Sequence, residues 1–222
     1  MDGRRYYEAY DQRYRAIHAE GKRWFSDAPS AIVREVLERF HVPEDAPMLE
    51  LGCGEGRDAL PLLSQGCNLL STDVSPEAIG DCRRRFPAYA QRFQVLDCVN
   101  GTLEGRFRFI YAVALIHMLV PDADRQAFYR FLREHLTEDG YALVCSMGDG
   151  TETRQSDIST AFELREREHE GRRVLVAGTS CRMVTMEEFT FEIRESGLRA
   201  AEIGRTAVPP DFPEMIYAVL RK

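Results

Sequence analysis

The sequence lacks several features that would place it in other classes of protein. No apolar run approaches the ~18 residues that a membrane-spanning helix requires. The opening stretch, MDGRRYYEAY, lacks the apolar segment of a secretory signal. Positive charge is also scarce, because 29 Lys and Arg against 36 Asp and Glu leave a formal net charge of −7. Since phosphate binding requires a basic face, we expect no nucleic-acid partner and no membrane partner.

Cysteine pairs at metal-binding spacing are absent as well. The six cysteines are scattered along the chain: Cys53, Cys67, Cys82, Cys98, Cys145 and Cys181. None forms a C-x-x-C pair, so we predict no zinc site and no other metal. Buried, reduced thiols in a cytoplasmic protein are the simplest interpretation.

What is present is enough apolar sequence for a full core. The chain has 222 residues, of which 44% are hydrophobic, and no internal repeat or low-complexity linker interrupts it. A chain of this size predicts a single domain, residues 1–222. Within it we expect N-terminal helices over residues 1–44 and an insertion over residues 147–184.

One stretch, residues 48–58, organises the rest of the chain and reads MLELGCGEGRD. A short apolar run carries an acidic residue, Glu50, and three glycines then occupy alternate positions: Gly52, Gly54 and Gly56. This spacing predicts a strand that ends in a tight turn and feeds a helix. Glycine permits positive φ and close approach of a ligand, and the free N–H groups of the helix start favour a negative ligand group. A nicotinamide-binding motif would have its third glycine at position 57, which is Arg57, so that cofactor is disfavoured.

Strand-like segments recur along the chain, separated at first by helix-like segments. After the first strand, further strands are expected at residues 68–72, 92–96, 107–115 and 140–146. This alternation predicts a parallel, doubly wound sheet with right-handed crossovers. The pattern then changes to a hairpin over residues 162–177, a helix, and two closing strands at 198–205 and 216–220.

The pattern E-x-G-x-G-x-G resembles the cofactor motif of class I S-adenosylmethionine-dependent methyltransferases. Within that class, LGCGEGRDALPLLSQG with TDVSPEAI is similar to the tellurite-resistance and thiopurine-type small-molecule methyltransferases, as is FRFIYAVALIHMLVPDADRQAF. The resemblance covers most of residues 48–150. It implies a Rossmann-like, doubly wound sheet of seven strands, mostly parallel with a C-terminal antiparallel hairpin. It also implies S-adenosylmethionine as cofactor and S-adenosylhomocysteine as product.

The resemblance implies roles for carboxylates at three successive strand ends, where open α/β sheets bind ligands. Glu50 would serve the methionine ammonium of the cofactor, Asp73 the ribose hydroxyls, and Asp97 the adenine amino group. Alone, Asp73 has an ordinary explanation as a turn cap, and Asp97 has one as a solvated loop residue. Three carboxylates at successive strand ends, together with the glycine loop, argue against coincidence. The other cofactor positions implied are Gly52, Cys53, Gly54, Gly56, Arg57, Val74, Cys98, Val113 and Ala114.

Methyl transfer is an in-line displacement at a sulfonium, so alignment and exclusion of water supply most of the catalysis. A base is needed only when the nucleophile arrives protonated. His117, after the fourth expected strand, is the candidate catalytic base, and a structural histidine is the alternative. Cys181 and Arg182 are weaker candidates on the substrate side. Arg182 would pair either with a substrate carboxylate or with one of the nearby glutamates.

The N-terminal residues 1–26 are rich in aromatic side chains that repeat at helical spacing. Two compatible interpretations follow: a helix docked permanently on the main domain, or a helical lid over the active site. For the lid, Tyr14 and Trp24 are the expected contacts near the sulfonium, because an aromatic face attracts a cation.

The sequence therefore predicts a methyltransferase acting on a small molecule. The alternative is a catalytically silent protein of the same fold that binds cofactor or a protein partner. The acceptor atom stays open between sulfur, nitrogen, oxygen and a chalcogen oxyanion, and no motif specifies an oligomeric state.

Overall fold

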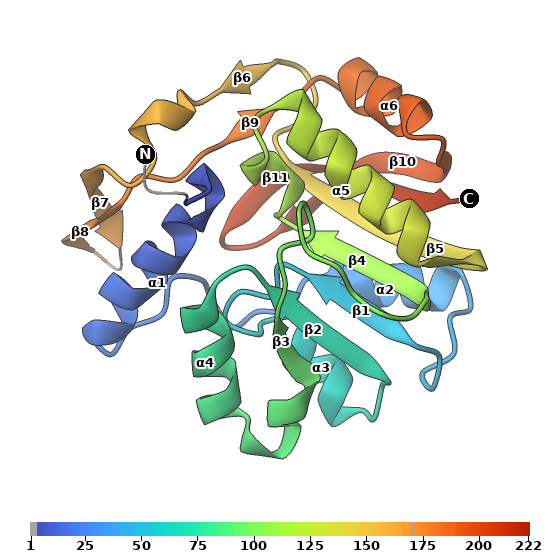
Figure 1. The fold of residues 1–222 in the computed structure, drawn as a ribbon, viewed down its shortest axis with the longest axis horizontal. Coiled ribbons are helices and arrows are strands. Elements are labelled where there is room, and N and C mark those ends of the chain that lie inside the picture. The colour runs from blue at the N-terminus through green and yellow to red at the C-terminus, as the bar shows by residue number, and fades with distance from the viewer. Residues whose placement is uncertain (1–3, 170) are drawn as a thin grey trace.

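A computed structural model describes residues 4–169 and 171–222 (Figure 1). At its centre lies a seven-stranded sheet with the strand order β10-β11-β5-β4-β1-β2-β3. Its strands are β1 (Met48–Leu51), β2 (Leu69–Asp73), β3 (Phe93–Val95), β4 (Phe107–Val113), β5 (Leu136–Met147), β10 (Arg199–Val208) and β11 (Phe212–Arg221). Strand β11 runs antiparallel to both of its neighbours, whereas the pairs among β1 to β5 are parallel. The predicted sheet, mostly parallel with a C-terminal antiparallel hairpin, is confirmed.

Helices cover both faces of this sheet (Figure 1). One face packs against α2 (Ala31–Arg39), α3 (Ala59–Ser64) and α4 (Pro76–Arg85), and the other against α5 (Asp122–His135) and α6 (Met186–Glu195). Along β4, Phe109 and Tyr111 point into the first of these cores, and Ile110 and Ala112 into the second. A strand buried on both faces reads as a nearly continuous apolar run, which is why β4 was readable from the sequence.

The N-terminal segment lies to one side of this sandwich. It consists of the 3-10 turn η1 (Tyr6–Glu8), helix α1 (Ala9–Ala19) and the chain that follows to residue 26. Helix α1 lies between α4 and a separate hairpin, β7 (Leu164–His169) with β8 (Arg172–Ala177) (Figure 1). The predicted hairpin is confirmed, and its buried face forms a small apolar cluster with the segment: Ile17, Val174, Val176 and, partly buried, Ala16 and Trp24.

Short elements complete the chain. Strands β6 (Arg154–Gln155) and β9 (Arg182–Met183) pair with each other within the expected insertion, and 3-10 turns occur at η2 (Pro87–Arg92), η3 (Ile116–Met118) and η4 (Ile158–Thr160). None of the helices among the described residues has the length and hydrophobicity of a membrane span.

The start of β5 differs from the prediction. The strand begins at Leu136, directly after α5, instead of at Gly140. Leu136 pairs with Phe107, and a register shift follows before Phe109 pairs with Tyr141. The exposed Glu138 and Asp139, followed by Gly140, look like a turn in the sequence, and only the pairing of this strand with β4 shows that they belong to it.

Candidate active site

One cavity lies at the carboxyl ends of β1, β2 and β4, where the topology predicts a ligand site. It brings together nearly all of the predicted cofactor residues. Those that line it are Glu50, Gly52, Cys53, Gly54, Arg57, Asp73, Val74, Asp97, Cys98, Val113 and Ala114. Gly56 is the predicted residue that the cavity wall does not include.

The glycine loop needs its glycines for different reasons. All three have a positive φ, +76° at Gly52, +52° at Gly54 and +81° at Gly56, in the left-handed region that side chains disfavour, but their surroundings differ. A Cβ atom on Gly54 would lie 2.8 Å from the Tyr14 hydroxyl, on the cavity side. A Cβ on Gly56 would instead lie 3.0 Å from Phe86 and 3.2 Å from the sulfur of Cys82, beside α4. The structure thus gives Gly56 a packing role that the glycine spacing alone does not distinguish from ligand contact.

Glu50 is the most unusual group in the cavity wall. It is buried within β1. The hydroxyl groups of Ser71 and Tyr111 lie near enough to its carboxyl group to favour the ionised form, but its Oε2 atom makes no well-formed hydrogen bond with a described residue. Burial, and secondarily the charge of Asp58, raises the pKa of Glu50 to about 8. A buried carboxyl oxygen without a well-formed hydrogen bond is costly, which makes Glu50 a candidate partner for a hydrogen-bond donor on a ligand. An ammonium group beside the open face of the glycine loop is such a donor, and the methionine end of S-adenosylmethionine carries one.

Asp73 is held rigidly at the end of β2. Its Oδ2 accepts a hydrogen bond of 2.8 Å from Gly54 N, and its Oδ1 one of 2.8 Å from Ser75 N. Burial raises the pKa of Asp73, although these backbone bonds oppose that effect. The carboxylate therefore joins the glycine loop to the start of α4 and presents its remaining lone pairs to the cavity.

Asp97 has more partners than the sequence suggests. Its Oδ1 accepts hydrogen bonds from the amides of Val99 and Asn100, and its Oδ2 accepts one from the Tyr7 hydroxyl at 2.9 Å and one from Asn100 Nδ2 at 3.1 Å. Tyr7 itself lines the cavity. An amino group that binds Asp97 must therefore share the carboxylate with Tyr7, a residue that the sequence analysis did not assign to the site.

The residues predicted to lie on the substrate side differ in whether they line the cavity. Tyr14 lines the cavity, but the cavity wall among the described residues includes none of His117, Trp24, Cys181 and Arg182. The Trp24 ring stacks on His169, 5.1 Å away, in the hairpin. Arg182 donates to Val120 O at 2.8 Å and pairs with Asp122 at 2.5 Å, and Cys181 pairs through its backbone with Ser156. Besides Asp122, a glutamate lies near Arg182, Glu192 at 3.8 Å, and the pairing of Arg182 with a substrate carboxylate stays a prediction.

His117 lies behind the cavity wall. It is 3% exposed, its ring is 6.0 Å from that of Phe212, and its Nδ1 has no hydrogen-bond partner among the described residues. Burial, and secondarily the charge of Arg125, lowers the pKa of His117 to about 4. The imidazole is therefore neutral near pH 7, and it packs edge-on against Phe212, which itself lines the cavity.

Other side chains of the cavity wall were not predicted as site residues. They include Tyr10 from α1, Phe25 from the chain after it, Met118 and Leu119 from the loop after β4, and Phe212 from β11. The aromatic density of the N-terminus is the one signal that pointed to the first two. The sequence around Phe212 has no feature that distinguishes this residue from one in the core.

Comparison with known proteins finds a family match for the central part of the chain. Residues 49–142 match a family described as "Methyltransferase domain". A segment of 58 residues, 26% of the chain, is 36% identical to an uncharacterised protein of Haemophilus influenzae, and the match spans 21% of that relative's length.

Solved structures resemble the chain over nearly its whole length. The CcbJ methyltransferase of Streptomyces caelestis has a TM-score of 0.70 at 18% identity, over 98% of this chain and 99% of that one. The 1,6-didemethyltoxoflavin-N1-methyltransferase of Burkholderia thailandensis, solved with that compound and S-adenosylhomocysteine, has a TM-score of 0.69 at 18% identity, over 96% and 87%. The glycopeptide N-methyltransferase MtfA, solved with S-adenosylmethionine, has a TM-score of 0.62 at 20% identity, over 87% and 94%.

At these identities the likeness establishes the fold. The predicted resemblance to S-adenosylmethionine-dependent methyltransferases is confirmed by the family match and by this fold. The finer likeness to tellurite-resistance and thiopurine-type enzymes stays a prediction.

Proposed function

We propose that this chain, which carries a methyltransferase domain, is an S-adenosylmethionine-dependent enzyme that methylates a small-molecule acceptor. The observation that carries the proposal is the convergence of Glu50, Asp73 and Asp97 with the open glycine loop on one cavity. The buried carboxyl group of Glu50 favours a cofactor that carries an ammonium group, and the glycopeptide N-methyltransferase MtfA, which has the same fold, was solved with S-adenosylmethionine, which carries one.

The residues present fit that cofactor. Glu50 would take the ammonium, Gly52 and Gly54 would allow the backbone to approach it, and Asp73 would hold the ribose diol. Bound there, S-adenosylmethionine supplies an activated methyl group on a sulfonium. The chain's own contribution is alignment and exclusion of water, because the leaving group needs no protonation.

We infer that the acceptor is a flat, uncharged molecule. Outside the predicted cofactor residues, the cavity wall includes the aromatic rings of Tyr10, Phe25 and Phe212 and the side chain of Met118. Among the described lining residues the one cationic side chain is Arg57, and it already pairs with Asp211 at 3.2 Å and with Asp58 at 3.6 Å. Aromatic walls bind apolar and aromatic groups, and an oxyanion would find no free cation there.

We further propose that the protein acts in the cytoplasm, without a nucleic-acid or membrane partner. The six cysteines are free thiols, and five of them are buried, which suits a reducing compartment. The net charge of −7 opposes binding to polyanions.

The test is turnover of S-adenosylmethionine to S-adenosylhomocysteine with a panel of phenols, nitrogen heteroaromatics, thiols, carboxylates and tellurite. We expect methyl transfer to aromatic acceptors and none to oxyanions. Asp73→Asn is the matched control, since it should weaken cofactor binding roughly ten- to a hundredfold in a folded protein. Cofactor binding without any turnover would instead support the catalytically silent alternative, and thermal stabilisation by a nicotinamide cofactor but not by S-adenosylhomocysteine would refute the proposal.

A further inference from the structure

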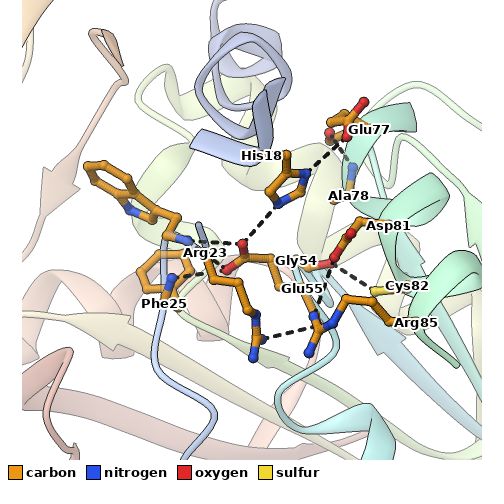
Figure 2. Close-up of polar contacts among 12 residues, drawn as sticks. His18, Arg23, Phe25, Gly54, Glu55, Glu77, Ala78, Asp81, Cys82 and Arg85 are labelled. Atoms are coloured by element: carbon orange, nitrogen blue, oxygen red, sulfur yellow. Dashed lines mark hydrogen bonds and ion pairs between the residues drawn. The ribbon is translucent and has the colours of Figure 1, made fainter. Parts of the chain in front are cut away.

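Glu55 lies inside the glycine loop, yet its side chain bonds to the N-terminal segment. Its carboxylate is 1% exposed and accepts hydrogen bonds from the backbone amides of Trp24, at 2.9 and 3.1 Å, and Phe25, at 2.9 Å. Figure 2 shows Glu55 at the centre of these contacts. In the cofactor motif, the position of Glu55 between two glycines is unspecified. Here it holds a segment about 30 residues earlier in the chain, because its carboxylate bonds to positions 24 and 25.

His18 adds a second attachment on the same carboxylate. Its Nε2 lies 3.0 Å from Glu55 Oε1, and its Nδ1 lies 2.9 Å from Glu77 Oε1 on α4 (Figure 2). The ring thus bridges two carboxylates, one from the glycine loop and one from the helix that follows β2. It also stacks on Tyr14, whose ring lines the cavity, at 5.7 Å between centroids.

Asp11 fixes the other end of α1. Its Oδ1 accepts hydrogen bonds from the Ser75 hydroxyl at 2.8 Å and from Glu77 N at 2.9 Å, at the first turn of α4. The seam between α1 and the cofactor side of the molecule is therefore polar. By contrast, α1 contacts the hairpin β7–β8 through the apolar side chains of Ile17, Val174 and Val176.

We propose that Glu55 is a positioning residue that closes the N-terminal segment over the cofactor site, with His18 as the titratable bridge of that closure. The inference rests on the proposed function, because the segment places Tyr14 and Phe25 in the wall of the same cavity. Closure and the conformation of the glycine loop are coupled, since one side chain belongs to the loop and holds the segment. A ligand on the loop and the segment above it therefore stabilise each other.

The charge pattern sets the pH dependence of this closure. Burial alone lowers the pKa of His18, but hydrogen bonds to Glu77 and Glu55, and the charge of Asp81, outweigh it and raise the pKa above its ordinary value. The charged groups that face the ring are thus Glu55, Glu77 and Asp81, and Arg84 pairs with Glu77 at 3.2 Å. The contribution of His18 to closure is complete below about pH 6.5 and is lost as pH rises through the raised value.

The experiment is hydrogen exchange of residues 9–25 in the ligand-free protein, with Glu55→Gln and His18→Gln as variants. The matched control is Glu20→Gln, which neutralises an exposed glutamate of the same segment that pairs with Lys22. After correction for intrinsic rates, the parent should exchange more slowly near pH 6 than near pH 8.5. Both variants should exchange roughly tenfold faster near pH 6 and lose most of that pH dependence, and the control should match the parent.

A second readout uses the cofactor product. Dissociation of S-adenosylhomocysteine, followed by the fluorescence of the single tryptophan, should be roughly tenfold faster in Glu55→Gln and His18→Gln. Unchanged exchange of residues 9–25 in His18→Gln, or equally faster exchange of the central sheet in both variants, would overturn the proposal. If S-adenosylhomocysteine fails to bind the parent, the proposed function falls, while the exchange experiment still decides the role of Glu55.

Discussion

The carboxyl group of Glu50 is unfavourable for folding because it is buried, but we propose that it binds the cofactor. It lies in the middle of β1, surrounded by buried residues, and its Oε2 makes no well-formed hydrogen bond among the residues described. An apolar residue would suit that position in the sheet better. The conflict between a local rule of folding and the residue present is what marks the position as functional.

Replacing Glu50 by Gln should raise stability and weaken cofactor binding. In the folded protein the pKa of Glu50 is about 8, against 4.5 for an ordinary glutamate. Between these values the unfolded chain is ionised and the folded protein keeps the proton, so this residue makes stability fall as pH rises. Near pH 8 we expect Glu50→Gln to be more stable by on the order of 2 kcal/mol, measured by denaturant unfolding without ligand.

The same substitution should raise the dissociation constant of S-adenosylhomocysteine roughly ten- to a hundredfold, because the ammonium loses a charged partner. In the parent, affinity should increase between about pH 6 and pH 8 as Glu50 loses its proton, and the variant should lack that rise. Calorimetry across this range tests both points. A variant that is less stable than the parent near pH 8, or that binds equally well, would contradict the assignment.

At the scale of elements, helix α1 and hairpin β7–β8 form one unit although more than half of the chain separates them. Their contact is the small cluster of Ile17, Val174 and Val176, which stands apart from the two cores of the sheet. Arg13 adds to it by donating two hydrogen bonds to Ala177 O, at 2.8 and 3.2 Å. The hairpin therefore supports the outer side of the segment that Glu55 holds on its inner side.

Truncating Ile17 tests this unit. We expect Ile17→Ala to weaken the packing by about 2–4 kcal/mol, because it removes a fully buried side chain from a cluster too small to rearrange. Hydrogen exchange should become faster in α1 and in both strands of the hairpin together, with the seven-stranded sheet unchanged. Leu175→Ala, at a position 57% exposed on the same hairpin, is the control and should stay within about 0.5 kcal/mol of the parent. Faster exchange in α1 alone would show that the two elements are independent.

The elements also show what the sequence could and could not reveal. The glycine loop, Asp73 and Asp97 were predictable because strand, turn and helix signals lie within a few residues of one another. Tyr7, Glu55 and Phe212 were not assigned to the site, because their roles depend on contacts with distant parts of the chain, such as that of Tyr7 with Asp97. The expected contact of Trp24 near the sulfonium failed to appear in the cavity wall for the same reason: a ring in the hairpin, His169, stacks on it instead.

At the scale of the whole molecule, Arg125 joins the rim of the cavity to the C-terminal half. It is 1% exposed and makes two hydrogen bonds to the carboxylate of Glu192 on α6, at 2.6 and 2.7 Å. It also donates to the carbonyl oxygens of Ile116 and Leu119, in the loop after β4. A single buried guanidinium thus connects α5, α6 and the loop that carries Met118 and Leu119 into the cavity wall.

Breaking this pair should destabilise the entire fold. We expect Arg125→Met to cost about 3 kcal/mol, because it removes the two short hydrogen bonds to the Glu192 carboxylate, which keeps only the more distant Tyr129 hydroxyl and Arg182, and the donor to two carbonyl groups. For a chain of this length that loss corresponds to a fall in Tm of roughly 6–12 °C, measured by calorimetry. The double variant Arg125→Met with Glu192→Met should recover much of the loss, since the unpaired charge is gone. No recovery in the double variant would show that the carbonyl contacts, rather than the ion pair, carry the effect.

The position of β11 in the sheet has a consequence for the order in which the molecule assembles. Strand β10 joins the sheet through β11, which lies between it and β5. The strands β1 to β5 can therefore pair as each follows the last during synthesis, whereas β10 must wait for a later segment before it gains a neighbour. Phe212, at the start of β11, also completes the cavity wall. We expect a nascent chain released before β11 to bury its glycine loop normally and still lack a closed binding site.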